Sequence, residues 1–262
     1  MSRRRQKSPS PRRAEPPRRG RPSDYIVPGE RAVVELLRGS PGRIHQLVAL
    51  DGRASAEIEA LAAAAAVEVR RVDANGLAEI CPPALARGVV AVASPPPEHA
   101  IESLIAGDGA GGRRVLVALD GVQDPHNLGA ILRSAEFFGA AGAFWPRDRA
   151  AGVTPVAVRT SAGATERLPL ARVTNLARAL ELCKDAGYWV VGTVVDGGRS
   201  LREIRADGLP ERLVVVLGSE EKGIRRLTRE RCDYLATIPR SGEIGSLNVS
   251  AAGAVCLAFL SG

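Results

Sequence analysis

From residue 113 onward, short apolar runs alternate with longer segments in which apolar residues recur every three or four positions. The apolar runs predict buried strands, and the helical spacing predicts amphipathic helices between them. The expected strands cover residues 115–119, 142–145, 189–195, 213–217 and 234–238, and the expected helices cover residues 128–138, 155–163, 175–185 and 251–260. Strands that are apolar on both faces and alternate with helices are typical of a parallel sheet covered on both sides. The C-terminal part of the chain is therefore predicted to be an α/β fold.

The pattern before residue 113 predicts a smaller α/β unit and a connecting segment. Strands are expected at residues 44–50, 67–72 and 88–93, and helices at residues 32–37, 54–66 and 77–80. We place this domain at residues 24–94, within the usual size range of domains, and a linker at residues 95–112. The linker ends in G-x-G-x-x-G, but a dinucleotide-binding fingerprint needs a strand before it and a helix after it, and here the expected order is reversed.

The net charge of +7 is unevenly distributed, because the excess of basic residues lies in the N-terminal segment. Residues 1–22 hold nine Lys/Arg and one Glu, whereas the remainder carries 27 basic and 28 acidic residues. A segment rich in Arg, Pro and Ser cannot bury a core, so residues 1–23 are predicted to be a disordered basic tail that either solubilises the protein or contacts RNA. A second candidate RNA contact is the arginine group Arg225, Arg226, Arg229 and Arg231.

Four widely spaced cysteines, Cys81, Cys183, Cys232 and Cys256, form no C-x-x-C pair and have no nearby His. This spacing argues against a zinc site and against disulfides, and it favours free thiols in a reducing cytoplasm. No apolar run is long enough to span a membrane, and the basic N-terminus lacks the apolar segment of a signal peptide. We therefore expect a cytoplasmic protein that binds neither membrane nor metal.

Polar segments follow three of the expected strands in the C-terminal part. Each carries side chains that packing does not require: Asn127 and Arg133 in residues 120–135, Glu220 in residues 217–223, and Ser246 and Asn248 in residues 238–250. The carboxyl ends of strands in open α/β sheets are where ligands bind. Taken singly, Asn127 is most simply a helix N-cap and Arg133 a solvated helix arginine.

Together, these three segments resemble the motifs of the SpoU (TrmH) family of RNA ribose methyltransferases, within the SPOUT superfamily. The resemblance covers nearly the whole chain, since residues 29–33 and 160–164 also match, and it extends to bacterial enzymes that methylate a guanosine of large-subunit rRNA. The N-terminal domain looks like the family's substrate-binding domain, which is similar to small ribosomal-protein-like RNA binders. Two positions depart from the family pattern: Glu221 stands where Gly is usual, and Ala86-Arg87-Gly88-Val89 stands in place of His-Gln-Gly-Val.

The resemblance implies a SPOUT parallel sheet with a deep trefoil knot over residues 113–262, an rRNA substrate, S-adenosylmethionine as cofactor, and a homodimer. It implies cofactor contacts, mostly through backbone groups, at Gly192, Thr193, Leu217, Gly218, Ile238 and Leu247. It also implies a catalytic set of Asn127, Arg133, Glu220, Ser246 and Asn248.

These residue types suit methyl transfer to a ribose hydroxyl. The sulfonium already activates the methyl carbon, so the reaction needs no metal, and the obstacle is that the hydroxyl is a very weak acid. A positioned base, or a cation that stabilises the developing alkoxide, contributes roughly 10²–10⁴-fold. Because a guanidinium resists deprotonation, we expect Arg133 to anchor phosphate and stabilise the alkoxide, with the proton acceptor left open.

Three other functions share parts of this pattern. A noncatalytic RNA-binding or ribosome-assembly factor could keep the fold, although the joint presence of Asn127, Arg133, Glu220 and Asn248 counts against it. Among enzymes, the alternatives are a tRNA methyltransferase and an adenosine-specific rRNA 2'-O-methyltransferase. The attached N-terminal domain favours rRNA.

Overall fold

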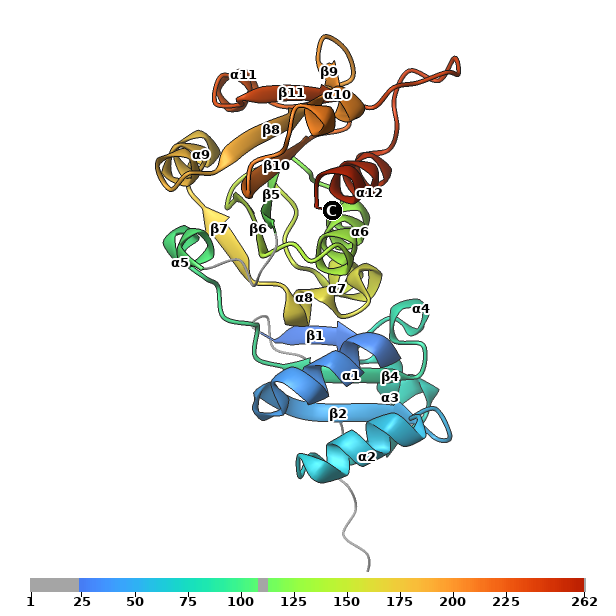
Figure 1. Cartoon of the computed structure of the whole chain (residues 1–262). Coiled ribbons are helices and arrows are strands. Elements are labelled where there is room, and N and C mark those ends of the chain that lie inside the picture. The colour runs from blue at the N-terminus through green and yellow to red at the C-terminus, as the bar shows by residue number, and fades with distance from the viewer. Residues whose placement is uncertain (1–23, 108–112, 262) are drawn as a thin grey trace, which may run out of the picture.

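The computed structural model describes residues 24–107 and 113–261, so the expected tail and residues 108–112 of the expected linker lie outside the described residues. Two β-sheets lie one above the other along the molecule (Figure 1). One belongs to residues 24–94, the N-terminal part, and the other to residues 113–261, the C-terminal part. Each sheet is flanked by its own helices, and the chain passes once between the two parts (Figure 1).

The N-terminal part contains a four-stranded sheet of order β1-β4-β2-β3, in which β4 is antiparallel to both of its neighbours and β2 is parallel to β3. Its strands are β1 (Tyr25–Pro28), β2 (Ile44–Leu50), β3 (Val69–Val72) and β4 (Val89–Ala93). Its helices are α1 (Glu30–Gly39), the 3-10 turn η1 (Pro41–Arg43), α2 (Ala56–Ala64), α3 (Ala74–Ala78) and α4 (Pro83–Ala86). Helix α2 begins after its expected start because the Ser55 side chain accepts the N–H of Ile58 and caps it. Strand β1 was not predicted, since four residues ending in proline carry too little pattern.

The C-terminal part contains a seven-stranded sheet of order β7-β6-β5-β10-β8-β11-β9, and all of its registered pairs are parallel, as the alternating pattern predicted. Its strands are β5 (Arg114–Asp120), β6 (Gly142–Pro146), β7 (Leu170–Val173), β8 (Trp189–Thr193), β9 (Arg199–Ser200), β10 (Arg212–Gly218) and β11 (Tyr234–Thr237). Its helices, with α5 from the preceding segment, are α5 (Ile101–Ala106), α6 (Pro125–Phe137), α7 (Pro155–Ser161), α8 (Ala164–Arg167), α9 (Leu176–Asp185), α10 (Leu201–Ala206), α11 (Arg226–Arg229) and α12 (Val249–Leu260). No helix in the described ranges is long and apolar enough to cross a membrane.

The core of the C-terminal part lies on both faces of its central strands. Helices α6, α10 and α12 cover one face, and α5 and α9 cover the other (Figure 1). Helix α12 approaches the sheet closely, because a side chain at Gly253 would lie 2.7 Å from Leu217 Cδ1. The uncharged last helix is thus buried along the side that carries Gly253, Cys256, Leu257 and Leu260.

The two parts meet where α7 and α8 pack against α1, α4 and β1, a contact that we call the junction. Val158 of α7 is buried in the apolar cluster of the N-terminal part. Beside it, Glu166 of α8 accepts hydrogen bonds from the Tyr25 hydroxyl at 2.7 Å and from Arg43 Nη1 at 2.8 Å. Burial, and then the charge of Glu166, raise the pKa of Tyr25 far above its usual value, so its hydroxyl stays protonated and remains a donor.

Candidate active site

The carboxyl ends of β5 and β10 and the start of α12 bring three polar side chains into one hydrogen-bonded group. Asn127 Nδ2 and Asn248 Nδ2 each donate to Glu220 Oε1 at 2.7 Å. Asn248 Nδ2 also lies 3.1 Å from Asn127 Oδ1. We call Asn127, Glu220 and Asn248 the amide-carboxylate cluster. Its members come from the three strand-end segments that the sequence singled out.

Asn248 is held through both ends of its amide. Its Oδ1 accepts hydrogen bonds from the backbone N–H of Ser250 at 2.9 Å and from the Ser250 hydroxyl at 2.6 Å, so Asn248 is the N-cap of α12. The helix begins at Val249 rather than at the expected residue 251. Since the cap occupies Oδ1, the Nδ2 group is the end that reaches Glu220.

Asn127 is not a helix cap. The N-cap of α6 is Asp124, whose carboxylate accepts the backbone N–H of His126 at 2.9 Å. The simplest interpretation of Asn127 from the sequence is therefore wrong. Asn127 lies in the first turn of α6, is nearly buried, and uses its amide for the cluster instead.

Asp120, at the end of β5, is a further polar residue of this region that the sequence analysis did not single out. Its side chain is fully buried, its Oδ2 accepts the backbone N–H of Arg225 at 2.7 Å, and its Oδ1 lies 3.3 Å from Arg225 Nε. A buried carboxylate is stable only with such partners. The contacts of Asp120 with Arg225 fix the end of the loop that carries Glu220. Its signal in the sequence is a carboxylate directly after an apolar strand.

The Glu220 loop also depends on Gly218. A Cβ atom at Gly218 would lie 2.2 Å from the Gly223 carbonyl carbon, so only glycine lets the loop return against the strand end. The loop closes through paired backbone hydrogen bonds between Ser219 and Gly223, at 3.1 and 2.9 Å. Glu220 therefore lies on a short, closed loop and not on a long free one.

A cavity of about 400 Å³ opens beside the cluster, between the carboxyl ends of β8, β10 and β11 and residues 238–249. Glu220 is part of its wall. Among the six expected cofactor residues, those that line the cavity are Thr193, Gly218, Ile238 and Leu247. Gly192 and Leu217 do not line it and are buried within β8 and β10. The size and the largely apolar walls with a few polar groups are those of a small-molecule site, and they fit a nucleoside-containing cofactor such as S-adenosylmethionine.

Arg133 and Ser246 lie outside the cluster. Both are exposed, and neither side chain has a hydrogen bond or ion pair with any residue in the described ranges. Arg133 follows Asn127 by six residues on α6, which corresponds to roughly 9 Å along the helix axis and a different face. The structure thus brings together Asn127, Glu220 and Asn248 of the expected catalytic set. Ser246 lines the cavity beside them without joining the cluster, and Arg133 lies apart.

Comparison with known proteins identifies the family. Residues 114–258 match the model of the SpoU rRNA Methylase family. This chain belongs to that family. It is 41% identical over 242 residues to a Pseudomonas putida protein named 23S rRNA (guanosine-2'-O-)-methyltransferase RlmB, which covers 87% of this chain and 92% of that relative. A protein of the same name from Burkholderia sp is 42% identical over 236 residues, covering 88% of this chain and 94% of the relative.

Solved structures of methyltransferases share the fold. The SpoU methyltransferase AviRb from Streptomyces viridochromogenes, in complex with the cofactor AdoMet, has a TM-score of 0.72 at 25% identity and covers 91% of this chain and 89% of its own. The AdoMet-bound rRNA methyltransferase from Sinorhizobium meliloti has a TM-score of 0.74 at 26% identity, covering 91% and 87%. Both similarities extend over the N-terminal as well as the C-terminal part.

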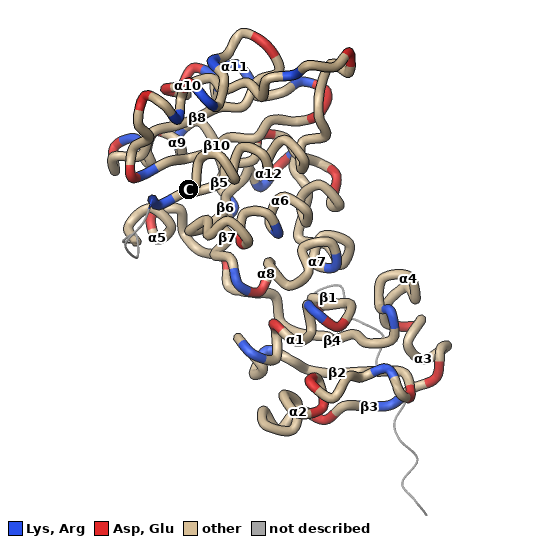
Figure 2. The backbone as a smooth tube through the Cα atoms, turned by 45° about the vertical axis from the view of Figure 1, so that its right-hand side comes forward, with Lys and Arg blue, Asp and Glu red and all other residues tan. Residues whose placement is uncertain are grey.

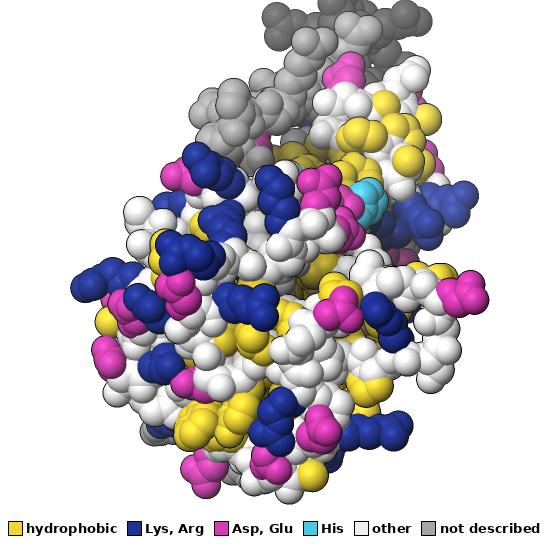
Figure 3. Space-filling model, turned by 90° about the horizontal axis from the view of Figure 1, so that it is seen from above, with side chains coloured by type: hydrophobic (Ala, Val, Ile, Leu, Met, Phe, Trp, Pro, Cys, Tyr) yellow, Lys and Arg dark blue, Asp and Glu magenta, His cyan; other side chains and the backbone are white. Residues whose placement is uncertain are grey.

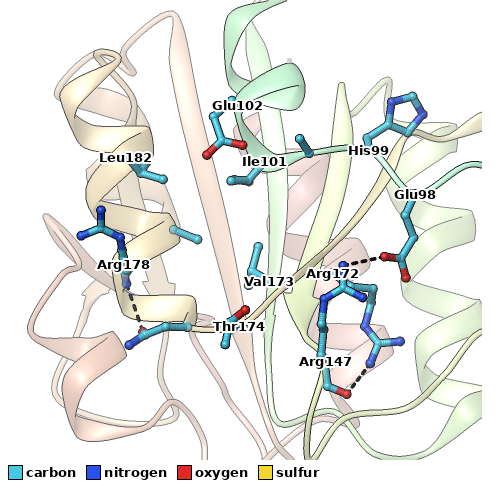
Figure 4. Close-up of a pocket in the computed structure, with 13 residues that line it drawn as sticks. Glu98, His99, Ile101, Glu102, Arg147, Arg172, Val173, Thr174, Arg178 and Leu182 are labelled. Carbon is cyan, nitrogen blue, oxygen red and sulfur yellow. Dashed lines mark hydrogen bonds and ion pairs between the residues drawn. The ribbon is translucent and has the colours of Figure 1, made fainter.

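A second cavity, of about 640 Å³, lies away from the SpoU motifs, between α5, α9 and the end of β7 (Figure 4). Two of its arginines are already engaged. Arg147 pairs with Glu98 at 2.7 Å, and Arg172 donates to the backbone carbonyls of Pro146 and Arg147. None of the expected site residues lines this cavity, and we assign it no part in the reaction.

Metal and thiol chemistry have no site of their own in the described part of the chain. No group of three His, Cys, Asp or Glu side chains that could hold a metal ion occurs among the described residues. Burial raises the pKa of Cys81 to about 11 and that of Cys183, Cys232 and Cys256 to about 12. At neutral pH these thiols carry almost no thiolate, so they are poor nucleophiles and poor ligands.

Proposed function

We propose that this protein transfers the methyl group of S-adenosylmethionine to the ribose 2'-hydroxyl of a guanosine in 23S rRNA. The observation that carries the proposal is the amide-carboxylate cluster at the wall of the 400 Å³ cavity. We propose that its residues are the family's catalytic residues, as the resemblance of the three strand-end segments implies. The names of the relatives support 23S rRNA and guanosine as substrate, and an rRNA substrate fits a cytoplasmic protein.

The cofactor site that we propose consists of Thr193, Gly218, Ile238 and Leu247, with Gly192 and Leu217 shaping the strands behind it. Thr193 Oγ1 already donates to the backbone carbonyl of Val216 at 3.0 Å. Its hydroxyl proton is therefore used within the sheet, which favours a contact through the Thr193 backbone. The apolar side chains of Ile238 and Leu247 suit the flat base of the cofactor.

The bound cofactor supplies a methyl carbon that its sulfonium has activated. The protein must then hold the ribose hydroxyl in line with that carbon and stabilise the charge that develops on oxygen. The amide-carboxylate cluster has a fixed geometry for the first task. For the second, we assign Arg133, whose guanidinium is exposed, has no partner among the described residues, and can hold a phosphate and the alkoxide oxygen together. Arg133 is not the proton acceptor, because a guanidinium resists deprotonation.

We also propose that the active protein is a homodimer. Two large apolar side chains at the cavity are strongly exposed, Ile244 at 82% and Leu247 at 53%, and Phe137 at the far end of α6 is 78% exposed. Ile244 and Leu247 lie on the segment that leads into α12, so a partner that covers them would meet the protein beside the cavity. The deep knot that the resemblance implies would involve the same segment.

We propose that residues 24–94 bind RNA, that residues 95–112 are a linker, and that residues 113–262 carry out methyl transfer. The separate sheets and apolar clusters of the two parts support this division. The cluster and the cavity both belong to the C-terminal part, which agrees with the span of the family match.

The test is methylation of ribosomal RNA from a deletion strain by the purified protein, with labelled S-adenosylmethionine and excess chelator. We expect label at one guanosine ribose of 23S rRNA, because neither the chemistry nor the described site requires metal. Ribosomal RNA from the wild-type strain is the matched control, since its target is already methylated and should accept no label. Label in tRNA or on adenosine, or no transfer, would contradict the proposal, and loss of transfer on chelation would contradict its metal independence.

A further inference from the structure

Three arginines gather on one side of the junction, from three elements distant in sequence. Arg31 lies in the first turn of α1, Arg87 directly follows α4, and Arg159 lies on α7. Figure 2 shows the basic segments of α1, α4 and α7 around the contact between the two parts. We call these three residues the junction arginines. None of them has a hydrogen bond or ion pair from its side chain to a residue in ranges 24–107 and 113–261.

Arg159 is the centre of this group. Its guanidinium lies directly over Gly29, where a Cβ atom would come within 1.9 Å of Nη1. Partial burial, followed by the positive charges of Arg87 and Arg31, lowers the pKa of Arg159 below its usual value. Three cations are thus held close enough to repel one another, and no carboxylate of the described residues pairs with any of them.

Arg87 is held in an unusual backbone conformation. Its φ angle is 45°, in the left-handed region that arginine rarely adopts, and Gly88 follows with a φ of 97°. Such conformations are unfavourable and cluster at functional sites. The stem of Arg53, another exposed arginine, lies against Gly88, so positive charge continues along this edge of the N-terminal part.

Most other arginines in the described ranges have a side-chain hydrogen bond or ion pair, including three of the four in the group Arg225, Arg226, Arg229 and Arg231. Arg225 pairs with Asp120, Arg226 with Glu230 and Arg231 with Glu181. On the upper face of the molecule, basic and acidic side chains lie side by side (Figure 3). The junction arginines differ because they form a group of one sign without partners among the described residues.

Helix α7 links the junction arginines to the active site. Next to Arg159, the Thr160 hydroxyl lies 3.4 Å from His126 Nδ1, and His126 precedes Asn127 of the amide-carboxylate cluster. Helices α6 and α7 are in close contact there, since a Cβ atom at Gly129 would lie 2.5 Å from the Ala157 carbonyl oxygen. An extended ligand that lies across Arg159 therefore has a short path over α7 to the amide-carboxylate cluster.

We propose that the junction arginines bind the phosphodiester backbone of the substrate RNA next to the target nucleotide, and so set how the RNA passes from the N-terminal part to the active site. This inference rests on the proposed function. An RNA backbone fits better than an acidic protein segment, because it offers a regular row of anions with the two-oxygen geometry that guanidinium groups hold in a fork.

The test uses the full-length protein with Arg31→Gln, Arg87→Gln and Arg159→Gln, singly and together. The affinity for a 23S rRNA fragment is measured against salt concentration. Each lost phosphate contact should lower the slope of log affinity against log salt by about 0.7–0.9, so the triple variant should lose about 2 in slope. The matched control is Arg202→Gln. Arg202 is an exposed arginine on α10, at the end of the C-terminal part that is far from the junction, and has no side-chain partner in the described ranges, so the slope should stay unchanged.

Two further measurements separate this inference from loss of folding and from the proposed function. Cofactor binding by calorimetry and the methylation rate at saturating RNA should stay near wild type, because none of the three arginines lines the cavity. If the triple variant is unstable, the exposed single variants Arg31→Gln and Arg87→Gln carry the test. If the wild-type protein methylates 23S rRNA but the variants keep its RNA affinity and its salt slope, the inference is overturned and the proposed function stands. Lower affinity with an unchanged slope would also overturn it, whereas failure of the wild type to methylate rRNA would refute the proposed function.

Discussion

The amide-carboxylate cluster and the junction arginines use polar groups in opposite ways. In the cluster, one oxygen of Glu220 accepts two amide donors, so the geometry is fixed before any ligand arrives. At the junction, three cations approach one another without a carboxylate from the described residues. Fixed geometry suits a reaction that depends on alignment, and unpaired cations suit a polyanion. The contrast predicts that the cluster controls turnover and that the junction controls RNA affinity.

The largest effect should come from breaking the cluster with Glu220→Ala. This change leaves the donors of Asn127 and Asn248 without their shared acceptor, so both amides lose their alignment. We expect turnover to fall roughly 10²–10³-fold, the scale seen when one preorganised polar group is removed from an active site. Single-turnover methylation at saturating RNA and cofactor measures this directly.

Glu220→Gln is the matched control for that prediction. Glutamine keeps an oxygen that can accept both amide donors but removes the negative charge. If Glu220 acts by positioning the two asparagines, Glu220→Gln should retain most of the turnover. A Gln variant that binds cofactor normally and is as inactive as the Ala variant would contradict this role and would assign Glu220 to proton transfer.

Arg133 tests the comparison further, because it shares a helix with Asn127 but, like the junction arginines, has no side-chain partner in the part of the chain that the structure describes. We expect Arg133→Lys to bind cofactor normally but to lose roughly 10–10²-fold in turnover, since lysine keeps the charge and gives up the planar fork. Calorimetry and single-turnover rates check the two halves of this prediction. Turnover near wild type would show that charge alone is enough, and Arg133→Ala gives the lower reference.

The sequence predicted the parts of the fold that carry their own pattern. Residues 115–119 and 213–217 are uniformly apolar, and they form the paired centre of the parallel sheet. The short edge strands β7 and β9 were missed, because β7 has four residues and β9 is the pair Arg199–Ser200, which is hydrogen-bonded to β11. In both strands, tertiary contacts decide the conformation. The limit lies in length, since two to four residues carry no reliable period.

The residues of the candidate site also differ in whether the sequence could predict their role. Asn248 could be foreseen because a helix start demands a cap, and the motifs pointed to Asn127 and Glu220. Sequence could not show that Asp120 would be fully buried against Arg225, since that depends on where the loop returns. Nor could it assemble Arg31, Arg87 and Arg159, which share no pattern and meet only because α7 packs against α1 and α4.

The smallest effect on activity, and a large one on stability, should follow from Glu166→Ala. Glu166 is the paired counterpart of the junction arginines: its side chain is 1% exposed and holds Arg43, itself 16% exposed, together with the Tyr25 hydroxyl. Removing it leaves a largely buried cation and a buried hydroxyl without their acceptor. We expect the free energy of unfolding to fall by about 3–5 kcal/mol. Thermal unfolding with and without cofactor measures the loss.

Glu98→Ala is the control for Glu166→Ala, because it removes an ion pair of the same chemistry, with Arg147, in which both side chains are at least half exposed. That pair should contribute only about 0–1 kcal/mol, since solvent screens it. Equal losses of stability in the two variants would contradict the claim that burial gives Glu166 its importance. If Glu166→Ala instead lowered the salt slope of RNA binding as far as the triple arginine variant, the junction would be acting as one structural unit, and the distinction between its paired and unpaired arginines would fail.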